Sequence, residues 1–272
     1  MTDVKGKVVA LTGAASGIGR ALALVLVEKG AEVAISDVDE VGLAATLGLV
    51  SDKSKVSTHV LDVRDKAAWA RYAAAVEAQH GGADVVINNA GVAIKASVEQ
   101  ISYEDFEFVM SVNFWGVVYG TKTFIPLFRK RGGGHVVNIS SINGMVPFAL
   151  QAPYNASKYA VLGFNETLMQ ELAGEPIKVT SVHPGGIRTN IARKARHVSA
   201  DEAKFFDTIA RTTSESAAEQ IVRGIERNRQ RVYVGTDAKI MAASKRILPA
   251  FTVNLFGRVS NNWRKRPPAG RT

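Results

Sequence analysis

Short apolar runs rich in valine and isoleucine alternate along the chain with longer segments of helical periodicity. Runs of this length and composition are typical of strands buried on both faces of a parallel sheet. They lie at Lys7–Leu11, Glu32–Ser36, Val56–Leu61, Asp84–Ile87, His135–Ile139, Ile177–Val182 and Arg231–Val234. Strands that alternate with helices predict an α/β fold, with about seven strands in one doubly wound parallel sheet and a single domain.

Between these runs, apolar residues recur three or four positions apart, which predicts helices. The predicted helices cover Arg20–Lys29, Val38–Leu49, Asp65 to Gln79, Tyr103–Arg131, the segment around Tyr154 and Ser214–Asn228. Asp65 and Ser214 are expected to cap their helices, because a side-chain oxygen there can accept from the first backbone amides. The polar, weakly periodic segment Ile191–Thr213 is expected to be mobile or to act as a lid.

The composition excludes several kinds of site. The chain has 272 residues, of which 46% are hydrophobic, which is enough to form the core of one α/β domain. It contains no cysteine, which excludes disulfides, thiolate metal sites and cysteine nucleophiles. The apolar run near the first residue is too short for a signal sequence or a membrane span, so a cytoplasmic location is expected.

The net charge of +9 is concentrated at the carboxyl-terminal end. The chain has 34 Lys or Arg and 25 Asp or Glu; eight of the basic and none of the acidic residues lie in 238–272, leaving 26 against 25, or +1. A nucleic-acid-binding protein would more often carry a basic face on its folded body, so no nucleic-acid partner is expected. We therefore predict one domain over residues 1–237 and a basic, partly amphipathic extension over 238–272.

A helical wheel of Lys239–Leu255 separates an apolar arc from basic residues. The arc holds Ile240, Met241, Ile247, Leu248, Phe251 and Leu255, with Lys239, Lys245 and Arg246 largely opposite. Pro249 is expected to kink this helix, and Lys245 and Arg246 prevent it from spanning a bilayer. Two alternatives are open: the arc packs on the body or on a neighbouring subunit, or it lies on an anionic membrane as a peripheral contact.

A glycine-rich turn, TGAASGIG, follows the first predicted strand. Gly13 permits a tight turn, Gly17 lets the backbone approach a pyrophosphate, and Gly19 allows close helix–strand packing. The helix that follows offers amide groups and a positive dipole to phosphates. Strand, glycine turn, helix and second strand in this order predict a dinucleotide-binding site.

Asp37 ends the second strand, eighteen residues after Gly19. A carboxylate at this position can accept both ribose hydroxyls of adenosine and repels a 2′-phosphate, which favours NAD over NADP. Ser16 stands where a basic residue could have met that phosphate, and no Arg or Lys directly follows Asp37. Asp37 could also serve as a helix cap for Val38–Leu49.

Three further strand ends carry candidate residues. Asp62 and Val63 follow the third strand and could lie against the adenine. The sequence Asn88-Asn89-Ala90-Gly91 follows the fourth strand. It forms either a structural turn or a wall of the cofactor site, because ligands of such sheets bind at the carboxyl edge. His183 ends the sixth strand and is expected to be structural rather than a base.

Tyr154 and Lys158 are four residues apart on a predicted helix, so their side chains share one face. A free tyrosine has a pKa of about 10, and an adjacent ammonium in a poorly solvated cleft favours the phenolate and lowers that pKa. Tyr154 could then pass a proton to or from an oxygen that the Ser141 hydroxyl also holds. A bare pair of this kind is more often a chance feature of a surface helix, so the interpretation depends on the other motifs.

Taken in order, TGAASGIG, NNAG, Asn113, Ser141, Tyr154-x-x-x-Lys158 and PGGIRT resemble the motifs of the short-chain dehydrogenase/reductase family over about residues 5–235. The resemblance implies a Rossmann fold in which Tyr154 is the general acid or base and Ser141 stabilises the substrate oxygen. It also implies that Lys158 holds the nicotinamide ribose and lowers the pKa of Tyr154, and that Asn113 anchors a relay water. Because asparagine is an indifferent helix former, a bend in the helix or a packing amide are alternatives for Asn113.

The same resemblance implies the cofactor-binding positions, NAD as the cofactor and no metal. These positions are Gly13, Ser16, Gly17, Ile18, Gly19, Asp37, Asp62, Val63, Asn89, Ala90, Gly91, Tyr154, Lys158, Pro184, Gly185, Ile187 and Thr189. Thr189 is expected to bond the nicotinamide carboxamide.

The implied function is an oxidoreductase that transfers a hydride between NAD(H) and a secondary alcohol or ketone. The uncharged loop Met145–Leu150 between Ser141 and Tyr154 favours an apolar or lipid-like substrate, unless the loop simply packs. The alternative is a catalytically silent dinucleotide-binding sensor or scaffold, against which the complete Ser141–Tyr154–Lys158 set argues. The family commonly forms homotetramers or homodimers through the Asn113 and Tyr154 helices, where Phe114, Trp115, Val118, Phe124, Leu162 and Phe164 either offer an apolar interface or cover the sheet.

Overall fold

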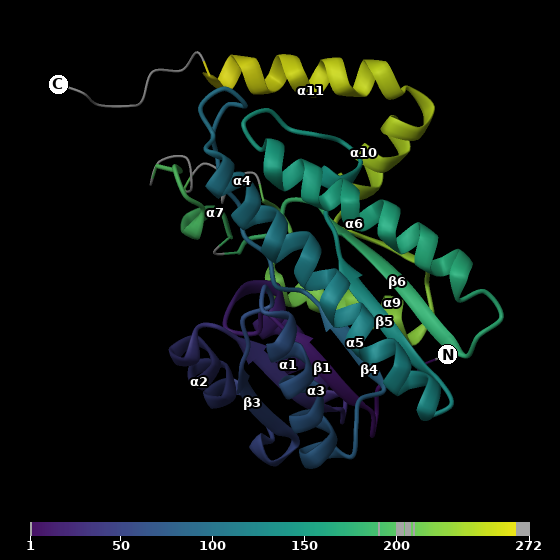
Figure 1. Cartoon of the computed structure of the whole chain (residues 1–272). Helices are drawn as coiled ribbons and strands as arrows, with labels where there is room; N and C mark the ends of the chain where they lie inside the picture. Colours follow the sequence, from purple (N-terminus) through teal and green to yellow (C-terminus); the bar gives the residue numbers. More distant parts are fainter. Residues whose placement is uncertain (1, 190, 200–203, 205–207, 209, 265–272) are drawn as a thin grey trace.

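A sheet of seven parallel strands in the order β3-β2-β1-β4-β5-β6-β7 forms the centre of the molecule (Figure 1). The computed structural model describes residues 2–189, 191–199, 204, 208 and 210–264. The strands are β1 Val8–Thr12, β2 Glu32–Asp37, β3 Val56–Val60, β4 Val85–Asn88, β5 Gly134–Ile139, β6 Ile177–Pro184 and β7 Arg231–Val234. The predicted doubly wound α/β fold and its seven strands are therefore confirmed.

The central strands are buried on both faces, as their unbroken apolar sequences require. All five residues of β1 are buried. Val9 and Leu11 pack into the core on one side of the sheet, while Val8 and Ala10 pack into the core on the other. The two cores are separate because successive side chains of a strand point to opposite faces.

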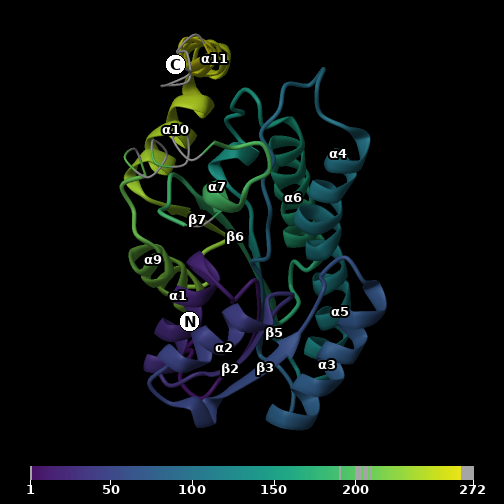
Figure 2. The same cartoon turned by 90° about the vertical axis from the view of Figure 1, so that its left-hand side faces the viewer.

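Helices cover both faces of the sheet (Figure 2). One face carries α1 Gly17–Glu28, α2 Glu40–Leu49 and α9 Ser214–Glu226; the other carries α3 Lys66–His80, α5 Gly116–Lys130 and α6 Ala152–Glu171. The short elements are η1 Lys53–Lys55, η3 Ile142–Gly144 and α7 Ile191–Lys194. The strand order reverses between β1 and β4, so the carboxyl ends of these strands flank the crevice in which such sheets bind ligands.

The predicted helix Tyr103–Arg131 is interrupted. It consists of α4 Tyr103–Met110, the π-helical turn η2 Ser111–Trp115 and α5. Asn113 lies in the π turn, and its buried side chain bonds to the backbone N–H and C=O of Val92 at 2.8 and 2.9 Å and to the Ser157 hydroxyl at 3.1 Å. These bonds tie the widened turn to a neighbouring loop and to α6. Such turns are common at functional sites.

Two of the expected helix caps differ from the structure. Asp65 caps α3 as predicted, with its carboxylate accepting from the Ala67 amide. Thr213, rather than Ser214, caps α9. Asp39, rather than Asp37, caps α2, because Asp37 is still the last residue of β2.

The carboxyl-terminal region forms two helices, α10 Thr236–Ile247 and α11 Pro249–Arg264. The expected kink at Pro249 is a complete break, after which α11 runs across the top of the molecule (Figure 1). Along the described chain, no helix combines the length and apolar character needed to cross a bilayer. The predicted boundary at 237/238 lies within the first turn of α10, where Ala238 is buried.

Candidate active site

The glycine turn between β1 and α1 forms a cradle that larger residues would fill. Gly13 and Gly17 have φ values of +70° and +55°, which L side chains rarely adopt. A Cβ atom at Gly19 would lie 2.0 Å from the Gly13 carbonyl oxygen, and one at Gly13 would lie 2.8 Å from the Ala90 Cα. The turn thus needs glycine at these positions for its shape.

The amino terminus of α1 faces this cradle with open donors. Ser16 precedes the helix and makes no side-chain capping bond, and the first turn holds no acidic residue. The first backbone amides of a helix have no carbonyl within the helix to bind. Together with the positive end of the helix dipole, they fit the pyrophosphate of a dinucleotide.

Asp37 supports the same turn from the end of β2. Its carboxylate accepts from the Ala15 amide at 3.0 Å and from the Asp39 amide at 3.1 Å. The guanidinium of Arg20 donates to the carbonyls of Ala15 and Gly42 and to the Thr46 hydroxyl. The carboxylate at the expected ribose site is therefore held in place, while the nearby cation is engaged by the protein itself.

Asp62 follows β3, and its carboxylate is paired with Arg64 through contacts of 2.6–3.0 Å. These hydrogen bonds lower the pKa of Asp62. Val63 packs against Gly116: a Cβ atom placed on Gly116 would lie 2.9 Å from the Val63 side chain. Arg64 was not among the candidates, because nothing in the sequence distinguishes it from an ordinary surface arginine.

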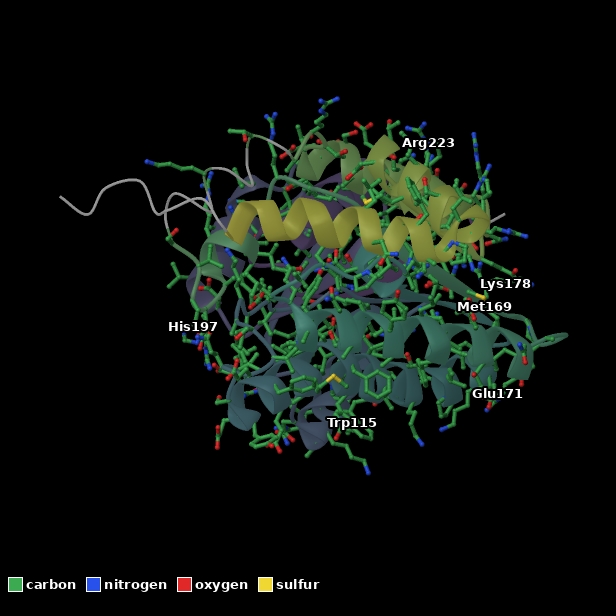
Figure 3. All side chains as sticks on the ribbon, turned by 90° about the horizontal axis from the view of Figure 1, so that it is seen from above. Trp115, Met169, Glu171, Lys178, His197 and Arg223 are labelled. Carbon is green, nitrogen blue, oxygen red and sulfur yellow. The ribbon has the colours of Figure 1, made fainter. Side chains whose placement is uncertain are left out.

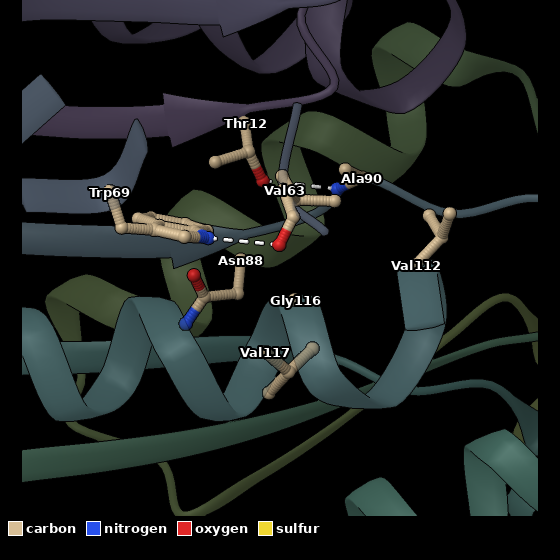
Figure 4. Close-up of a pocket in the computed structure, with 8 residues that line it drawn as sticks. All are labelled: Thr12, Val63, Trp69, Asn88, Ala90, Val112, Gly116 and Val117. Carbon is tan, nitrogen blue, oxygen red and sulfur yellow. Dashed lines mark hydrogen bonds between the residues drawn. The ribbon is translucent and has the colours of Figure 1, made fainter. Parts of the chain in front are cut away.

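The Asn88–Gly91 segment has a clear structural role. The Asn89 side chain donates to the Thr12 and Gly13 carbonyls at 2.9 and 3.2 Å. The Thr12 hydroxyl accepts from the Asn89 and Ala90 amides at 3.0 and 3.1 Å. Figure 4 shows a narrow pocket next to this turn, lined in part by Thr12, Val63, Asn88 and Ala90. The segment therefore fixes the glycine turn from the β4 side.

The neighbouring serines at the end of β5 have different roles. The Ser140 hydroxyl donates to the Lys158 carbonyl at 2.9 Å and so joins β5 to α6. The Ser141 hydroxyl accepts from the Asn143 amide at 3.1 Å and donates to the Asn143 side-chain oxygen at 3.4 Å, and it lies close enough to the Tyr154 phenol to lower the pKa of that phenol. Ser141 is thus the serine that reaches the phenol.

Tyr154 lies in the first turn of α6 and is half-buried. Burial raises its pKa, and the hydrogen bond with Ser141 acts in the opposite direction. This result differs from the expected lowering by Lys158. The Lys158 ammonium is 5.7 Å from the centre of the Tyr154 ring and donates to the Ile139 carbonyl at 2.9 Å. Desolvation of the phenol outweighs an ammonium at that distance.

Lys158 is itself almost fully buried, and its burial lowers its pKa to about 8. A Cβ placed on Gly91 would be 3.7 Å from the Lys158 nitrogen and 3.4 Å from the Asn113 side-chain oxygen. Lys158, Gly91, Asn113, Ser141 and Tyr154 therefore converge from four separate segments. Both hydrogens of the Asn113 side-chain amide bind protein oxygens. The side chain therefore acts as a packing amide, which was one of the alternatives for this residue. A relay water would have to bind another atom of Asn113.

A cluster of amides that the sequence reasoning missed holds the loop between Ser141 and Tyr154. The Asn143 side chain donates to Gln151 at 2.8 Å and to Asn155 at 2.9 Å. Asn155 in turn donates to the Phe148 carbonyl at 2.7 Å. In the sequence, Asn143 and Asn155 stand on either side of an apolar loop. This spacing alone does not predict their contact, because it forms only when the loop folds back on α6.

The segment Gly185–Thr189 follows β6, whose last residue is Pro184, and lies beside the glycine turn. The Gly186 amide donates to the Asp237 carboxylate at 2.6 Å, so the first turn of α10 anchors this segment. A Cβ on Gly17 would lie 3.3 Å from the Thr189 side chain, which places the two segments side by side. Ile187 is buried and pairs with Thr212 in a single bridge. Asp237 was also missed, since it lies more than 50 residues from its partner.

The segment Ile191–Thr213 is described only in part; residues 200–203, 205–207 and 209 lie outside the described ranges. Arg196 bridges to Ile94 through the backbone, pairs with Asp105 at 2.6 Å and stacks over Phe108 at 4.5 Å. This part of the expected lid therefore contacts α4 and the loop after β4. Its mobility remains a prediction.

A chain of buried polar groups crosses the sheet and ends at the active site. Side-chain bonds run from Asn88 to Asn138, Asn165, Ser181 and His183 at 2.7, 2.6, 2.8 and 3.0 Å. The ring nitrogen Nδ1 of His183 then bonds the Ser141 carbonyl at 3.4 Å. A carbonyl only accepts, so Nδ1 carries the hydrogen. Burial lowers the pKa of His183 to about 4, so the ring is neutral and structural at neutral pH.

Comparison with known proteins agrees with this geometry. The family model described as "short chain dehydrogenase" matches residues 7–200. "Putative oxidoreductase SadH" of Mycobacterium tuberculosis is 45% identical over 256 residues, which cover 91% of this chain and 93% of that protein.

Two solved structures illustrate the fold with cofactors. A short chain dehydrogenase/reductase from Burkholderia phymatum in complex with NAD has a TM-score of 0.81 at 25% identity, and the match covers 100% of this chain and 99% of that one. The closed form of serine dehydrogenase complexed with NADP+ has a TM-score of 0.75 at 27% identity, with 79% and 88% covered. Similar structures thus contain either cofactor.

Proposed function

Because the chain belongs to the short-chain dehydrogenase family, we propose that it is an NAD-dependent oxidoreductase acting on an apolar or lipid-like secondary alcohol or ketone. The observation that carries the proposal is the convergence of Ser141, Tyr154 and Lys158 beside the glycine turn. A silent nucleotide sensor would need the glycine turn alone. It would have no use for a phenol, a hydroxyl and a buried ammonium at one point.

In this proposal the dinucleotide lies along the carboxyl edge of the sheet. Gly13, Gly17 and the first amides of α1 would hold the pyrophosphate, Asp37 the adenosine ribose, and Thr189 the carboxamide. When bound, the nicotinamide supplies the hydride acceptor or donor. The protein's task is then to move one proton at the substrate oxygen.

Tyr154 is the group that would move this proton. Its raised pKa keeps the phenol protonated at neutral pH, which suits a general acid that donates to a carbonyl oxygen during reduction. Ser141 would bond the same oxygen and stabilise its developing charge. During oxidation the phenol of Tyr154 must first lose its proton to act as the base, and its raised pKa makes this loss easier at alkaline pH. We therefore expect oxidation to be favoured by alkaline pH.

The preference for NAD rests on Asp37. A 2′-phosphate beside this carboxylate would be repelled, and Arg20 is already bonded to Ala15, Gly42 and Thr46. The similar solved structures hold NAD in one case and NADP+ in another, so the family alone does not decide the cofactor.

The apolar substrate class rests on the loop Met145–Leu150. It carries no charged residue, Val146 is buried, and Phe148 and Leu150 are half-buried. The Asn143–Asn155 contact fixes this loop next to Ser141. A sugar or an acid would leave its polar groups without partners against such a surface.

A screen of secondary alcohols with NAD+ tests the proposed function. Tyr154→Phe should lower kcat by roughly 10²–10⁴-fold, because it removes the proton donor, while the affinity for NADH stays within a few-fold. Tyr103→Phe is the matched control, since Tyr103 is 86% exposed on α4, and it should retain full activity. More than a tenth of wild-type kcat in Tyr154→Phe would refute the proton role. NADH binding without turnover on any carbonyl would favour the sensor alternative.

Assembly into a homodimer or homotetramer through α4, α5 and α6 is also proposed. Trp115 is 47% exposed, and Phe114, Leu162 and Phe164 are half-buried. Val118 and Phe124 are buried in the protein's own core, so for these two the alternative of covering the sheet holds. Sedimentation should show a species larger than the 29.1 kDa chain at micromolar concentration, and Trp115→Glu should shift it towards the monomer. A monomeric wild-type protein would contradict this assembly.

A further inference from the structure

The two carboxyl-terminal helices, α10 and α11, form an arm that exposes large apolar side chains. Ile240, Ile247, Leu248, Phe251 and Leu255 are 61%, 74%, 53%, 60% and 44% exposed. Within each helix they recur at helical spacing: Ile240 and Ile247 are seven residues apart, and Phe251 and Leu255 are four apart. The arm therefore presents an apolar face on each helix.

The body of the protein does not cover this face. Among the described residues, α11 packs chiefly against α10, and Figures 1 and 3 show it lying across the top of the molecule. Thr252 is the buried residue of its first turns, and its amide and hydroxyl both bond the Leu248 carbonyl. The alternative in which the apolar arc packs on its own body is therefore wrong for these five side chains.

The charge of the arm identifies what could cover it. The two helices carry five Lys or Arg and one acidic residue, Asp237, whose carboxylate bonds the Gly186 amide. Three more basic residues follow in 265–272, so residues 238–272 carry eight Lys or Arg and no acidic residue, whereas the remainder is close to neutral at +1. A second copy of the chain would bring a near-neutral body or another strongly basic arm, and neither complements this charge. An anionic bilayer surface offers both phosphate groups for the cations and hydrocarbon for the apolar face. We propose that the arm is an interfacial anchor for membranes that contain anionic lipid.

The arm lies at the same edge of the molecule as the active site. Helix α10 packs against β7 and against η3, the turn that follows Ser141. Its residue Asp237 holds the Gly186 amide in the cofactor-binding segment. An anchor at this place would bring the mouth of the active site close to the bilayer. The inference deepens the proposed function and rests on it in one respect: the substrate would be a lipid-like alcohol or ketone that resides in the membrane.

Vesicle flotation of the 272-residue chain tests the anchor. The vesicles are phosphatidylcholine alone or phosphatidylcholine with phosphatidylglycerol, at low salt. Each basic residue near an anionic surface should raise the partition coefficient about fivefold, so Lys245→Glu with Arg246→Glu should lower it at least tenfold. Phe251→Asp with Leu255→Asp should lower it by a similar factor, through loss of apolar burial. Neither pair belongs to the catalytic or cofactor-binding residues.

Two control variants make the same changes in charge as the two arm variants, but at exposed positions far from the arm. Lys53→Glu with Lys66→Glu reverses two charges near β3, and Val41→Asp with Leu49→Asp adds two acids on α2. Both controls should float like the wild type. All variants should oxidise a small water-soluble alcohol at the wild-type rate, whereas turnover of a vesicle-embedded alcohol should fall with the arm variants.

Flotation measures membrane binding and does not require catalysis. A failure of the membrane proposal can therefore be distinguished from a failure of the proposed enzymatic activity. No flotation of the wild type with anionic vesicles would refute it, as would equal flotation of the arm variants and the controls. A smaller sedimenting species for Phe251→Asp with Leu255→Asp, with unchanged flotation, would assign the apolar face to a second copy of the chain instead.

Discussion

Acid should destabilise this protein through two buried histidines, well above the pH at which carboxylates titrate. His135 and His183 are 1% and 0% exposed, and burial lowers the pKa of each to about 4 from an ordinary value of 6.5. Between these values the unfolded state binds more protons than the folded state, so stability is full above pH 6.5 and is lost as the pH falls towards 4. Lowering the pH from 7.5 to 5.5 should therefore cost roughly 1.3 kcal/mol per histidine, or about 3 kcal/mol for both.

Urea unfolding followed by tryptophan fluorescence at pH 7.5 and 5.5 measures this loss. His135 bonds Thr180 through Nε2 at 2.8 Å and His183 bonds Ser141 through Nδ1, so His135→Gln and His183→Asn keep the principal donor or acceptor and remove the titration. Each variant should begin less stable at pH 7.5 and lose about 1.3 kcal/mol less than the wild type on acidification. If the variant that combines His135→Gln and His183→Asn lost as much stability on acidification as the wild type, these two histidines would not be the cause of the acid sensitivity.

Three further outcomes are expected. The wild type should show a higher kcat/KM with NAD than with NADP. The double substitution Asp37→Ser with Val38→Arg should reverse this preference, because it removes a repulsive carboxylate and adds a cation. Equal values for both cofactors in the wild type would contradict the role of Asp37. Gly19→Ala should weaken NAD binding at least tenfold by calorimetry, because its Cβ would lie 2.0 Å from a backbone oxygen; Gly48→Ala, with nothing within 4 Å, should bind normally and unfold at a slightly higher temperature. Finally, kcat/KM for alcohol oxidation should rise with pH up to at least pH 9.5, because the raised pKa of Tyr154 requires alkaline pH to form the phenolate base. A flat profile between pH 6.5 and 9.5 would argue against Tyr154 as the base.

The sheet could be predicted from the sequence because its signal is local. Runs such as Val8–Thr12 are uniformly apolar since both faces of the strand are covered, and glycine at positions 13, 17 and 19 is required by the turn itself. These features depend on residues close together in the chain.

Two sets of contacts that the sequence did not indicate join residues far apart in the chain. The π turn at Asn113 is stabilised by Val92 and Ser157, 21 and 44 residues away. Asp237 and Gly186 are 51 residues apart. No periodicity in the helix around Asn113, and no motif around Asp237, indicates these contacts.

The expected pKa of Tyr154 was wrong in direction for a related reason. Spacing on a helix correctly placed Lys158 on the same face, but the energetic balance depends on burial and on the second partner of the ammonium. The Ile139 carbonyl takes the hydrogen bond, and desolvation of the phenol dominates. A four-residue spacing indicates proximity and says little about solvation.

The position of the arm also has a consequence for which part of the chain can be removed. The last strand ends at Val234, and Asp237, which bonds the Gly186 amide, follows three residues later. Among the described residues, α11 packs chiefly with α10, and none of the hydrogen bonds described for the segment after β6 comes from α11. A chain terminated after α10 therefore retains every hydrogen bond described for that segment.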